Sequence, residues 1–287
     1  MLHLLTSLLL LGTSPQSSVA TTRPLPGAEI LSVHSPAVVR NMPSLSLTAS
    51  GAMLVDVTSG EVLYAKNPDI ARPMASLTKI MTALLLIENH DLNETVTIPP
   101  VAQSIQGSSI DLRTGMQFKL EDLLTAMMLP SANDVAYSLA VHHGKTVKQF
   151  VAMMNDRARS LGLTKTHFSN PAGLDDVNQY ATPRDLAWLT LAALRKPEFQ
   201  TLVSTKEAKV ENKEGASFLL RNTNEILHSQ PNVFGVKTGT TDNARECLIV
   251  LFTQNRRSYA LVLLGSKDRY TDALQVMKEV SKNLSAS

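Results

Sequence analysis

The sequence predicts an α+β fold: an antiparallel five-stranded sheet built from both chain ends, flanked by helices, with a mostly helical subdomain inserted between them. Two observations predict this arrangement. Short strand-like segments with turn signals lie near both ends of the 287-residue chain, at residues 53–64 and 233–265. The long segment between them carries apolar residues at helical spacing instead. A chain of this length can bury the core that such a fold needs.

The first elements are a strand pair and a buried helix. Residues 53–57 and 61–64 are expected to form a β-hairpin, with Gly60 supplying the turn. Residues 76–89 are apolar on most faces, and a helix that is hydrophobic all round is buried.

The middle of the chain is expected to be helical, at residues 120–128, 133–142, 147–160 and 183–195. The chain then returns to the sheet through strands at residues 233–238, 247–253 and 259–265. A final helix, residues 271–284, is expected to pack on the sheet, because it lacks the basic and aromatic residues of a membrane-surface helix. We therefore expect the sheet part at about 49–90 and 225–287, with the helical subdomain at about 91–224.

The N-terminal residues predict export. Residues 4–11 are leucine-rich and residues 18–20 form a small-residue cleavage site, which is typical of a signal peptide over residues 1–20. The apolar run is shorter than the roughly 20 residues that cross a bilayer. Little positive charge precedes it, so an uncleaved anchor and a misassigned start stay open as alternatives. Residues 21–48 hold four prolines and are expected to form an extended lead-in to the domain at 49–287.

Composition argues against several classes of partner. The net charge of +2 and the lack of a basic run give no reason to expect a nucleic-acid partner. The single cysteine, Cys247, lies in an apolar run and is expected to be a buried small hydrophobe. His142 and His143 lack zinc-ligand spacing, and the sequence contains no H-E-x-x-H motif. We expect neither a metal nor another cofactor in the reaction.

Three short motifs indicate the chemistry: S-x-x-K at residues 76–79, S-x-N at 131–133 and K-T-G at 237–239. Serine is a poor nucleophile and must lose its proton as it attacks a carbonyl group. One helical turn separates Ser76 from Lys79, so the amine can reach the hydroxyl. The amine accepts a proton only when neutral, and an apolar helix disfavours the ammonium form. Together the motifs are typical of an acyl-transfer enzyme whose base is lysine.

The other two motifs supply the rest of such a site. Ser131 would relay a proton to the leaving amine, and Asn133 would hydrogen-bond the amide of the substrate. Lys237 and its neighbouring hydroxyls would hold a carboxylate. Gly239 lets a substrate backbone approach the strand, and a backbone N–H there could form an oxyanion hole with that of Ser76.

Each motif alone also has a purely structural interpretation. Ser76 could cap its helix while Lys79 extends to solvent, and Ser131 could cap the helix that follows it. A second S-x-N, at residues 281–283, shows how easily that pattern arises.

With the three motifs in this order, the sequence resembles the penicillin-recognising serine D-Ala-D-Ala peptidases, specifically the low-molecular-weight carboxypeptidase family. The resemblance covers residues 51–267, most of the chain after the lead-in. It also rests on matching segments at residues 73–79, 107–109, 121–124, 129–134, 168–174 and 235–241. The resemblance implies the β-lactamase/DD-peptidase type of α+β fold.

The resemblance implies that Ser76 forms the acyl-enzyme with Lys79 as its base. The expected site residues are Ser76, Lys79 and Ser131 for catalysis, and Asn133, Lys237, Thr238, Gly239 and Thr240 for substrate binding. The implied substrates are peptidoglycan stem peptides that end in D-Ala-D-Ala and lose the terminal D-Ala. β-Lactams would acylate Ser76 as substrate mimics. The protein is then expected in the periplasm or on the extracellular cell-wall face.

Two alternatives stay open within this chemistry. A DD-endopeptidase would cut cross-links instead of chain ends, and residues 221–224 resemble such enzymes. A class A β-lactamase needs a carboxylate to activate the deacylating water. Residues 165–178 contain no glutamate, and their only carboxylates are Asp175 and Asp176.

The chain departs from the family pattern in two places. The best-known members add a small β-rich domain and a C-terminal amphipathic anchor, whereas this chain ends at Ser287 with neither. We therefore expect no stable membrane anchor after signal cleavage. Arg245 stands where the family commonly has glycine, so the turn beyond the Lys237 strand is expected to differ.

Overall fold

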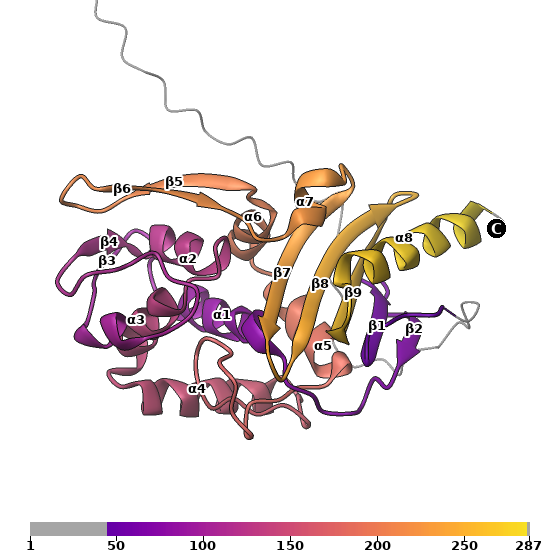
Figure 1. Cartoon of the computed structure of the whole chain (residues 1–287), viewed down its shortest axis with the longest axis horizontal. Coiled ribbons are helices and arrows are strands. Elements are labelled where there is room, and N and C mark those ends of the chain that lie inside the picture. The colour runs from indigo at the N-terminus through magenta and orange to yellow at the C-terminus, as the bar shows by residue number, and fades with distance from the viewer. Residues whose placement is uncertain (1–44, 286–287) are drawn as a thin grey trace, which may run out of the picture.

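A five-stranded antiparallel sheet forms one part of the protein in the computed structural model, which describes residues 45–285 (Figure 1). Its strands, in the order in which they lie side by side, are β2 (Val62–Lys66), β1 (Gly51–Asp56), β9 (Arg257–Ser266), β8 (Arg245–Gln254) and β7 (Val233–Thr241). Strand β1 pairs with β9, so both ends of the chain build the sheet. This confirms the predicted fold class. The predicted signal peptide and most of the lead-in lie outside the described residues.

The sheet is covered on both faces, which explains why β8 and β9 are almost uninterrupted apolar runs. Helix α8 (Arg269–Ser285) packs on one face, and α5 (Pro183–Ala193) packs on the other (Figure 1). Successive residues of a strand point to opposite faces. Leu248 accordingly belongs to the smaller core under α8, and Ile249 belongs to the main core.

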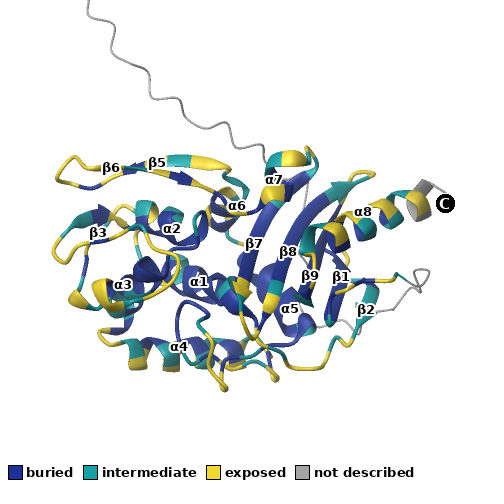
Figure 2. Ribbon diagram, in the orientation of Figure 1, coloured by how far each residue is buried: buried dark blue, intermediate teal, exposed yellow. Residues whose placement is uncertain are grey.

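Helix α1 (Lys79–Asn89) runs through the centre of the molecule and packs against most of the other helices (Figure 1). Its residues from Lys79 to Leu86 are all buried (Figure 2), as its apolar composition predicts. A short 3-10 helix, η1 (Ala75–Thr78), precedes α1, so the first turn of the predicted helix is 3-10 and not α-helical. Ala75 has a φ of 49°, a conformation that no regular helix contains.

The middle of the chain forms the remaining helices and two small sheets. The helices are α2 (Leu120–Met128), α3 (Asn133–Gly144), α4 (Val147–Ser160), α6 (Pro197–Ser204), α7 (Glu225–Ser229) and the 3-10 helix η2 (Pro100–Ser104). The small sheets pair β3 (Thr95–Thr97) with β4 (Gln117–Lys119) and β5 (Glu207–Glu211) with β6 (Ser217–Arg221). The sequence did not predict these two hairpins or α6 and α7. Because α5 packs on β1 and β9, part of the chain's middle also contributes to the sheet layer.

The last described helix, α8, packs on β8 and β9 as expected. Across residues 45–285, none of the helices combines the length and the apolar composition that crossing a bilayer requires.

The turn between β7 and β8 contains the residue that departs from the family pattern. Residues 242–244 form a three-residue loop, and Thr241 pairs with Arg245 across it. Arg245 is exposed and has a φ of 55°, in the left-handed region that glycine adopts without strain. A residue in this conformation commonly closes a short hairpin loop. The turn therefore places an arginine in a conformation suited to glycine.

We expect the substitution Arg245→Gly to raise the free energy of unfolding by about 0.5–1 kcal/mol. The left-handed conformation costs a non-glycine residue about 1–2 kcal/mol, and the greater freedom of glycine in the unfolded chain removes part of that gain. Urea denaturation of both proteins measures the difference. The matched control is Arg245→Ala, which removes the same side chain but keeps Cβ and should gain nothing. Equal stabilisation by both substitutions would contradict this explanation.

Candidate active site

The first motif forms a direct contact between its serine and its lysine. Ser76 lies in η1 and is partly exposed, whereas Lys79 begins α1 and is fully buried. The Nζ atom of Lys79 lies 3.0 Å from Ser76 Oγ. Neither η1 nor α1 has a side-chain N-cap, and the lysine does not reach solvent. Ser76 therefore does not cap the helix through its side chain, and Lys79 does not extend to solvent, so both structural alternatives for this motif are wrong.

Lys79 has two further partners, and they determine where its lone pair lies. Nζ lies 2.8 Å from Asn133 Oδ1 and 2.8 Å from the carbonyl oxygen of Ala172. A neutral amine has two N–H groups and one lone pair. Both oxygens can only accept, so they take the two N–H groups and leave the lone pair facing the hydroxyl of Ser76. The geometry thus allows the amine to receive the serine proton.

The surroundings of Lys79 also favour the neutral amine. Burial lowers the pKa of Lys79 well below its usual range, because an ammonium loses its hydration in the interior. The positive charge of Lys237 lowers that pKa further, and the negative charge of Asp134 opposes both effects.

In the second motif, Asn133 contacts Lys79, whereas the Ser131 hydroxyl has no hydrogen-bond partner in the described part of the chain. Asn133 begins α3, and its Nδ2 donates to the carbonyl oxygen of Gln106 at 2.9 Å, which fixes the amide orientation. Ser131 has a φ of 66°, and its buried Oγ has no hydrogen-bond partner among the described residues. The N-cap of α3 is Ala132, so Ser131 does not cap the helix. A buried hydroxyl without a partner is available to a ligand or to a proton in transit.

The third motif lies on β7, directly beside the nucleophile. A Cβ atom at Gly239 would lie 2.9 Å from Ser76 N and 3.0 Å from Ala75 Cβ, so only glycine allows this approach. Lys237 is buried, and its Nζ donates to the carbonyl oxygen of Thr238 at 3.1 Å. Burial, with the positive charge of Arg269, lowers the pKa of Lys237 to about 7.

The two threonines of the expected set lie on the other side of β7 from Lys237 and Gly239, because side chains alternate along a strand. Thr238 shares a hydrogen bond of 2.6 Å with Thr223. Thr240 Oγ1 accepts from Nη1 of Arg269 at 2.8 Å, and the same nitrogen donates to the carbonyl oxygen of Gly239 at 3.0 Å. Sequence reasoning missed Arg269, because a lone arginine at the start of a helix has no motif around it.

Residues 168–174 form the part of the site whose role the sequence did not indicate. The Asn170 side chain organises this loop, since its Oδ1 accepts from the backbone N–H groups of Ala172, Gly173 and Leu174. The loop presents the Ala172 carbonyl to Lys79. Gly173 has a φ of 91°, and a Cβ atom there would lie 1.9 Å from the carbonyl oxygen of Ala75. The loop therefore packs against the backbone of the nucleophile's own turn.

Asp175, the carboxylate that follows this loop, is hydrogen-bonded to the turn after β7. Asp175 accepts hydrogen bonds from Thr241 Oγ1 at 2.6 Å and from Asn243 N at 3.2 Å. It therefore joins the loop to the turn after β7.

Comparisons with known proteins place this chain in a family. A family model described as D-alanyl-D-alanine carboxypeptidase, of the S11 peptidases, matches residues 37–268. The chain belongs to this family. Its fold also matches the crystal structure of the Streptomyces K15 DD-transpeptidase, with a TM-score of 0.78 and 32% identity over 82% of this chain and 97% of that one. These findings confirm the resemblance stated from the motifs and the expected serine-type carboxypeptidase class.

The curated relatives include proteins named carboxypeptidase and proteins named endopeptidase. A D-alanyl-D-alanine carboxypeptidase of Streptomyces sp. strain K15 is 33% identical over 91% of this chain and 96% of its own length. The carboxypeptidase DacF of Bacillus subtilis is 33% identical over 82% of this chain, which spans 61% of that protein. A D-alanyl-D-alanine endopeptidase of Escherichia coli is 32% identical over 78% of this chain and 74% of its own length.

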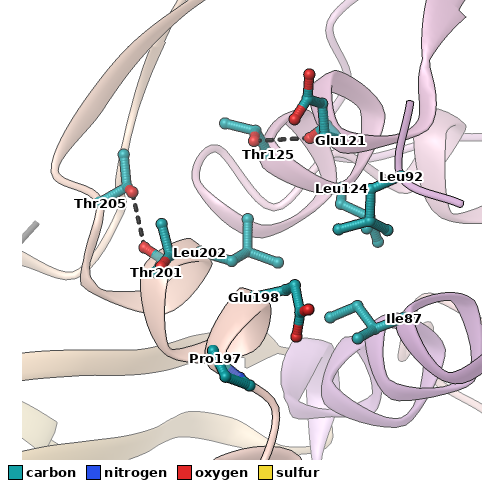
Figure 3. Close-up of a pocket in the computed structure, with 10 residues that line it drawn as sticks. All are labelled: Ile87, Leu92, Glu121, Leu124, Thr125, Pro197, Glu198, Thr201, Leu202 and Thr205. Carbon is teal, nitrogen blue, oxygen red and sulfur yellow. Dashed lines mark hydrogen bonds between the residues drawn. The ribbon is translucent and has the colours of Figure 1, made fainter. Parts of the chain in front are cut away.

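A separate cavity lies apart from these residues. It has a volume of about 370 Å³ and is lined by residues of α1, α2 and α6 and by the segments beside them (Figure 3). None of the eight expected site residues lines it.

We expect Gly173→Ala to lower the rate of penicillin acylation by about 10²-fold. The added methyl group must push the backbone of η1 away, and a displacement of about 1 Å is enough for a loss of that size. Stopped-flow measurement with a fluorescent penicillin gives the rate. The matched control is Gly215→Ala. Gly215 has a φ of 86°, and a Cβ atom there would meet nothing within 4 Å, so this variant carries the backbone penalty alone. Wild-type rates in the Gly173 variant would contradict the proposed packing.

Proposed function

We propose that the chain removes the terminal D-Ala from peptidoglycan stem peptides through an acyl-enzyme on Ser76. One observation supports this most strongly: the buried Nζ of Lys79 lies 3.0 Å from Ser76 Oγ and 2.8 Å from each of two acceptors, Asn133 Oδ1 and the Ala172 carbonyl oxygen, so a neutral amine would direct its lone pair at Ser76. Lys79 takes the hydroxyl proton while Oγ attacks the carbonyl carbon of the penultimate D-Ala. The developing oxyanion lies between Ser76 N–H and a backbone N–H of the strand beside it, β7.

The second half of the reaction returns the proton and frees the enzyme. The tetrahedral intermediate collapses, the bond to the terminal D-Ala breaks, and the leaving amine receives the proton of Lys79 through Ser131. The unpartnered hydroxyl of Ser131 supports this relay. Asn133 keeps the lysine in place and offers its second N–H to the substrate amide. Water then hydrolyses the ester on Ser76 and restores the free hydroxyl.

The terminal carboxylate of the substrate would bind along the outer edge of β7, the last strand of the sheet, where Lys237 from one face and Thr238 and Thr240 from the other could reach it. A carboxylate beside Lys237 favours its charged form and so offsets the effect of burial on its pKa. The guanidinium of Arg269, held at Thr240, adds a second positive charge near Lys237. A β-lactam carries a carboxylate beside a strained amide and would acylate Ser76 in the same orientation, without a leaving group that can depart.

Cleavage of cross-links is the second candidate function. The relatives named D-alanyl-D-alanine endopeptidase, from Escherichia coli and Pseudomonas aeruginosa, are 32% and 34% identical to this chain. Residues 221–224 lie beside the carboxylate site, since Thr223 bonds to Thr238. This segment contacts the substrate's leaving group in our proposal, so its shape decides whether a single D-Ala or a longer peptide fits.

The protein would work outside the cytoplasm, because its substrate lies in the cell wall. Residues 1–20 would act as the export signal and be removed, which releases the protein into the periplasm or onto the cell-wall face. The domain then begins near residue 49, and the reaction needs no cofactor or metal, since the base and the nucleophile are both side chains.

We expect fluorescent penicillin to label the wild-type protein and Ser76→Ala to lose at least about 10³-fold in labelling rate, because the nucleophile is absent. Gel fluorescence and intact-mass measurement report the adduct. Ser160→Ala, at the exposed end of α4, is the control and should label normally. A penicillin adduct on the alanine variant at position 76 would refute the nucleophile assignment.

Mass spectrometry of muropeptides incubated with the same proteins distinguishes the products. Loss of one D-Ala from monomers supports the carboxypeptidase proposal. Conversion of dimers to monomers, with monomers left intact, would support the endopeptidase instead.

A further inference from the structure

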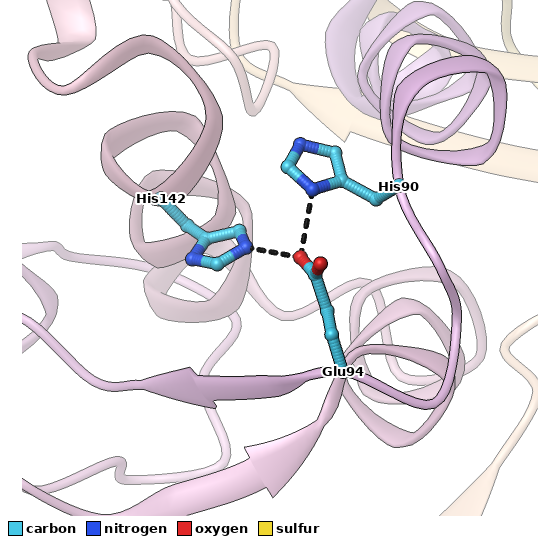
Figure 4. A group of neighbouring side chains, drawn as sticks. All are labelled: His90, Glu94 and His142. Carbon is cyan, nitrogen blue, oxygen red and sulfur yellow. Dashed lines mark hydrogen bonds and ion pairs between the residues drawn. The ribbon is translucent and has the colours of Figure 1, made fainter.

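Two histidines and a glutamate meet at the ends of the two helices that carry Lys79 and Asn133. His90 follows the last residue of α1, and His142 lies in the last turn of α3. Glu94 lies just before β3 and points between the two imidazole rings (Figure 4). A rise of 1.5 Å per residue along α1 places this cluster about 16 Å from the active site.

The cluster has the donor set and the spacing of a transition-metal site. Glu94 Oε1 lies 2.7 Å from His90 Nδ1 and 2.6 Å from His142 Nε2. The three atoms all lie within 4.8 Å of one another. Neighbouring ligand atoms around tetrahedral zinc are about 3.4 Å apart, since each lies about 2.0–2.1 Å from the metal. Opening the two contacts by less than about 1 Å makes room for the ion.

The next residue along α3 supplies the support that a metal-bound imidazole needs. His90 can ligate through Nδ1 only if its proton sits on Nε2, and that atom lies 2.7 Å from His143 Nδ1. His143 is held in place by Phe150, whose buried ring it meets edge-on with centroids 5.6 Å apart. An acceptor behind a ligating histidine fixes the tautomer and the ring orientation and raises affinity.

The cluster is also accessible. The side chains of His90, Glu94 and His142 are 17%, 33% and 24% exposed. An ion can therefore enter from solvent, and water can complete the coordination. Two imidazoles and one carboxylate are a set that zinc takes in proteins, with water in the fourth position.

We propose that His90, Glu94 and His142 bind a divalent transition-metal ion, zinc in the first place, with His143 positioning His90. This site is independent of the reaction at Ser76. The ion would join the end of α1 to the end of α3 and to the start of β3, in place of the hydrogen bonds that Glu94 makes with His90 and His142. Because the ion binds the folded protein, it stabilises α1 and α3, the two helices that carry Lys79 and Asn133.

Titration of the untagged protein with zinc chloride, after chelator treatment and buffer exchange, tests this site. We expect calorimetry to give one high-affinity ion per chain. Zinc at 100 times its dissociation constant should raise Tm by about 5–10 °C for a domain of this size. Cobalt should give the visible absorption of a four-coordinate ion and lose it when zinc is added. Wild-type protein without stoichiometric zinc binding would overturn the proposal.

Variants locate the ion. Glu94→Gln and His142→Gln keep polar side chains but lose a ligand, so each should weaken zinc binding by at least about 10²-fold and remove the Tm shift. His143→Gln should weaken it by about 10–100-fold, as expected of a supporting residue. The control is His167→Gln, whose imidazole bonds the carbonyl oxygen of Asn178 outside the cluster. Penicillin labelling of each variant verifies that it is folded. Unchanged zinc affinity in the Glu94 and His142 variants would place the ion elsewhere and refute the site.

Discussion

The burial of one amine is the constraint on which the rest of the structure depends. Lys79 begins a helix whose first eight residues are all buried, so its ammonium form cannot be hydrated. Burying the ammonium is costly, whereas a neutral amine can donate to two acceptors, Asn133 Oδ1 and the Ala172 carbonyl oxygen. Those acceptors come from α3 and from the 168–174 loop, so three parts of the chain must meet at one nitrogen. In the neutral amine, the same contacts would direct the lone pair at Ser76.

The close approach of backbones around Ser76 follows from this arrangement. The 168–174 loop reaches Lys79 only by passing against η1, and Gly173 leaves room for the Ala75 carbonyl. Strand β7 approaches from the other side, and Gly239 leaves room for Ser76 N. The nucleophile's turn is therefore held between two glycines. The left-handed conformation of Ala75 and of Ser131 fits the same pattern, since local strain persists where the surroundings determine the backbone.

The sequence predicted what depends on side-chain type and short-range spacing. The S-x-x-K pair, the buried α1 and the apolar β8 and β9 strands all follow from local patterns, and the structure contains them. The contact of Lys79 with the Ala172 carbonyl oxygen could not be predicted, because every residue has a backbone carbonyl. Only the packing of the loop determines which of them reaches the lysine. The sequence also did not predict the role of Arg269 or the cluster of His90, Glu94 and His142, for a related reason. Thr240 lies 29 residues from Arg269, and His142 lies 48 residues from Glu94, so each meeting depends on how the helices pack.

The ionisation of Lys79 can be measured directly by NMR titration of protein labelled with nitrogen-15 at the lysine side chains, with Lys79→Arg identifying the resonance by its loss. The account predicts a Lys79 pKa well below the ordinary value of 10.5, so that the amine is neutral above that pKa and acylation slows as pH falls through it. A Lys79 resonance that titrates at the ordinary lysine value would contradict the account, because the amine would then be charged and unable to accept the proton of Ser76.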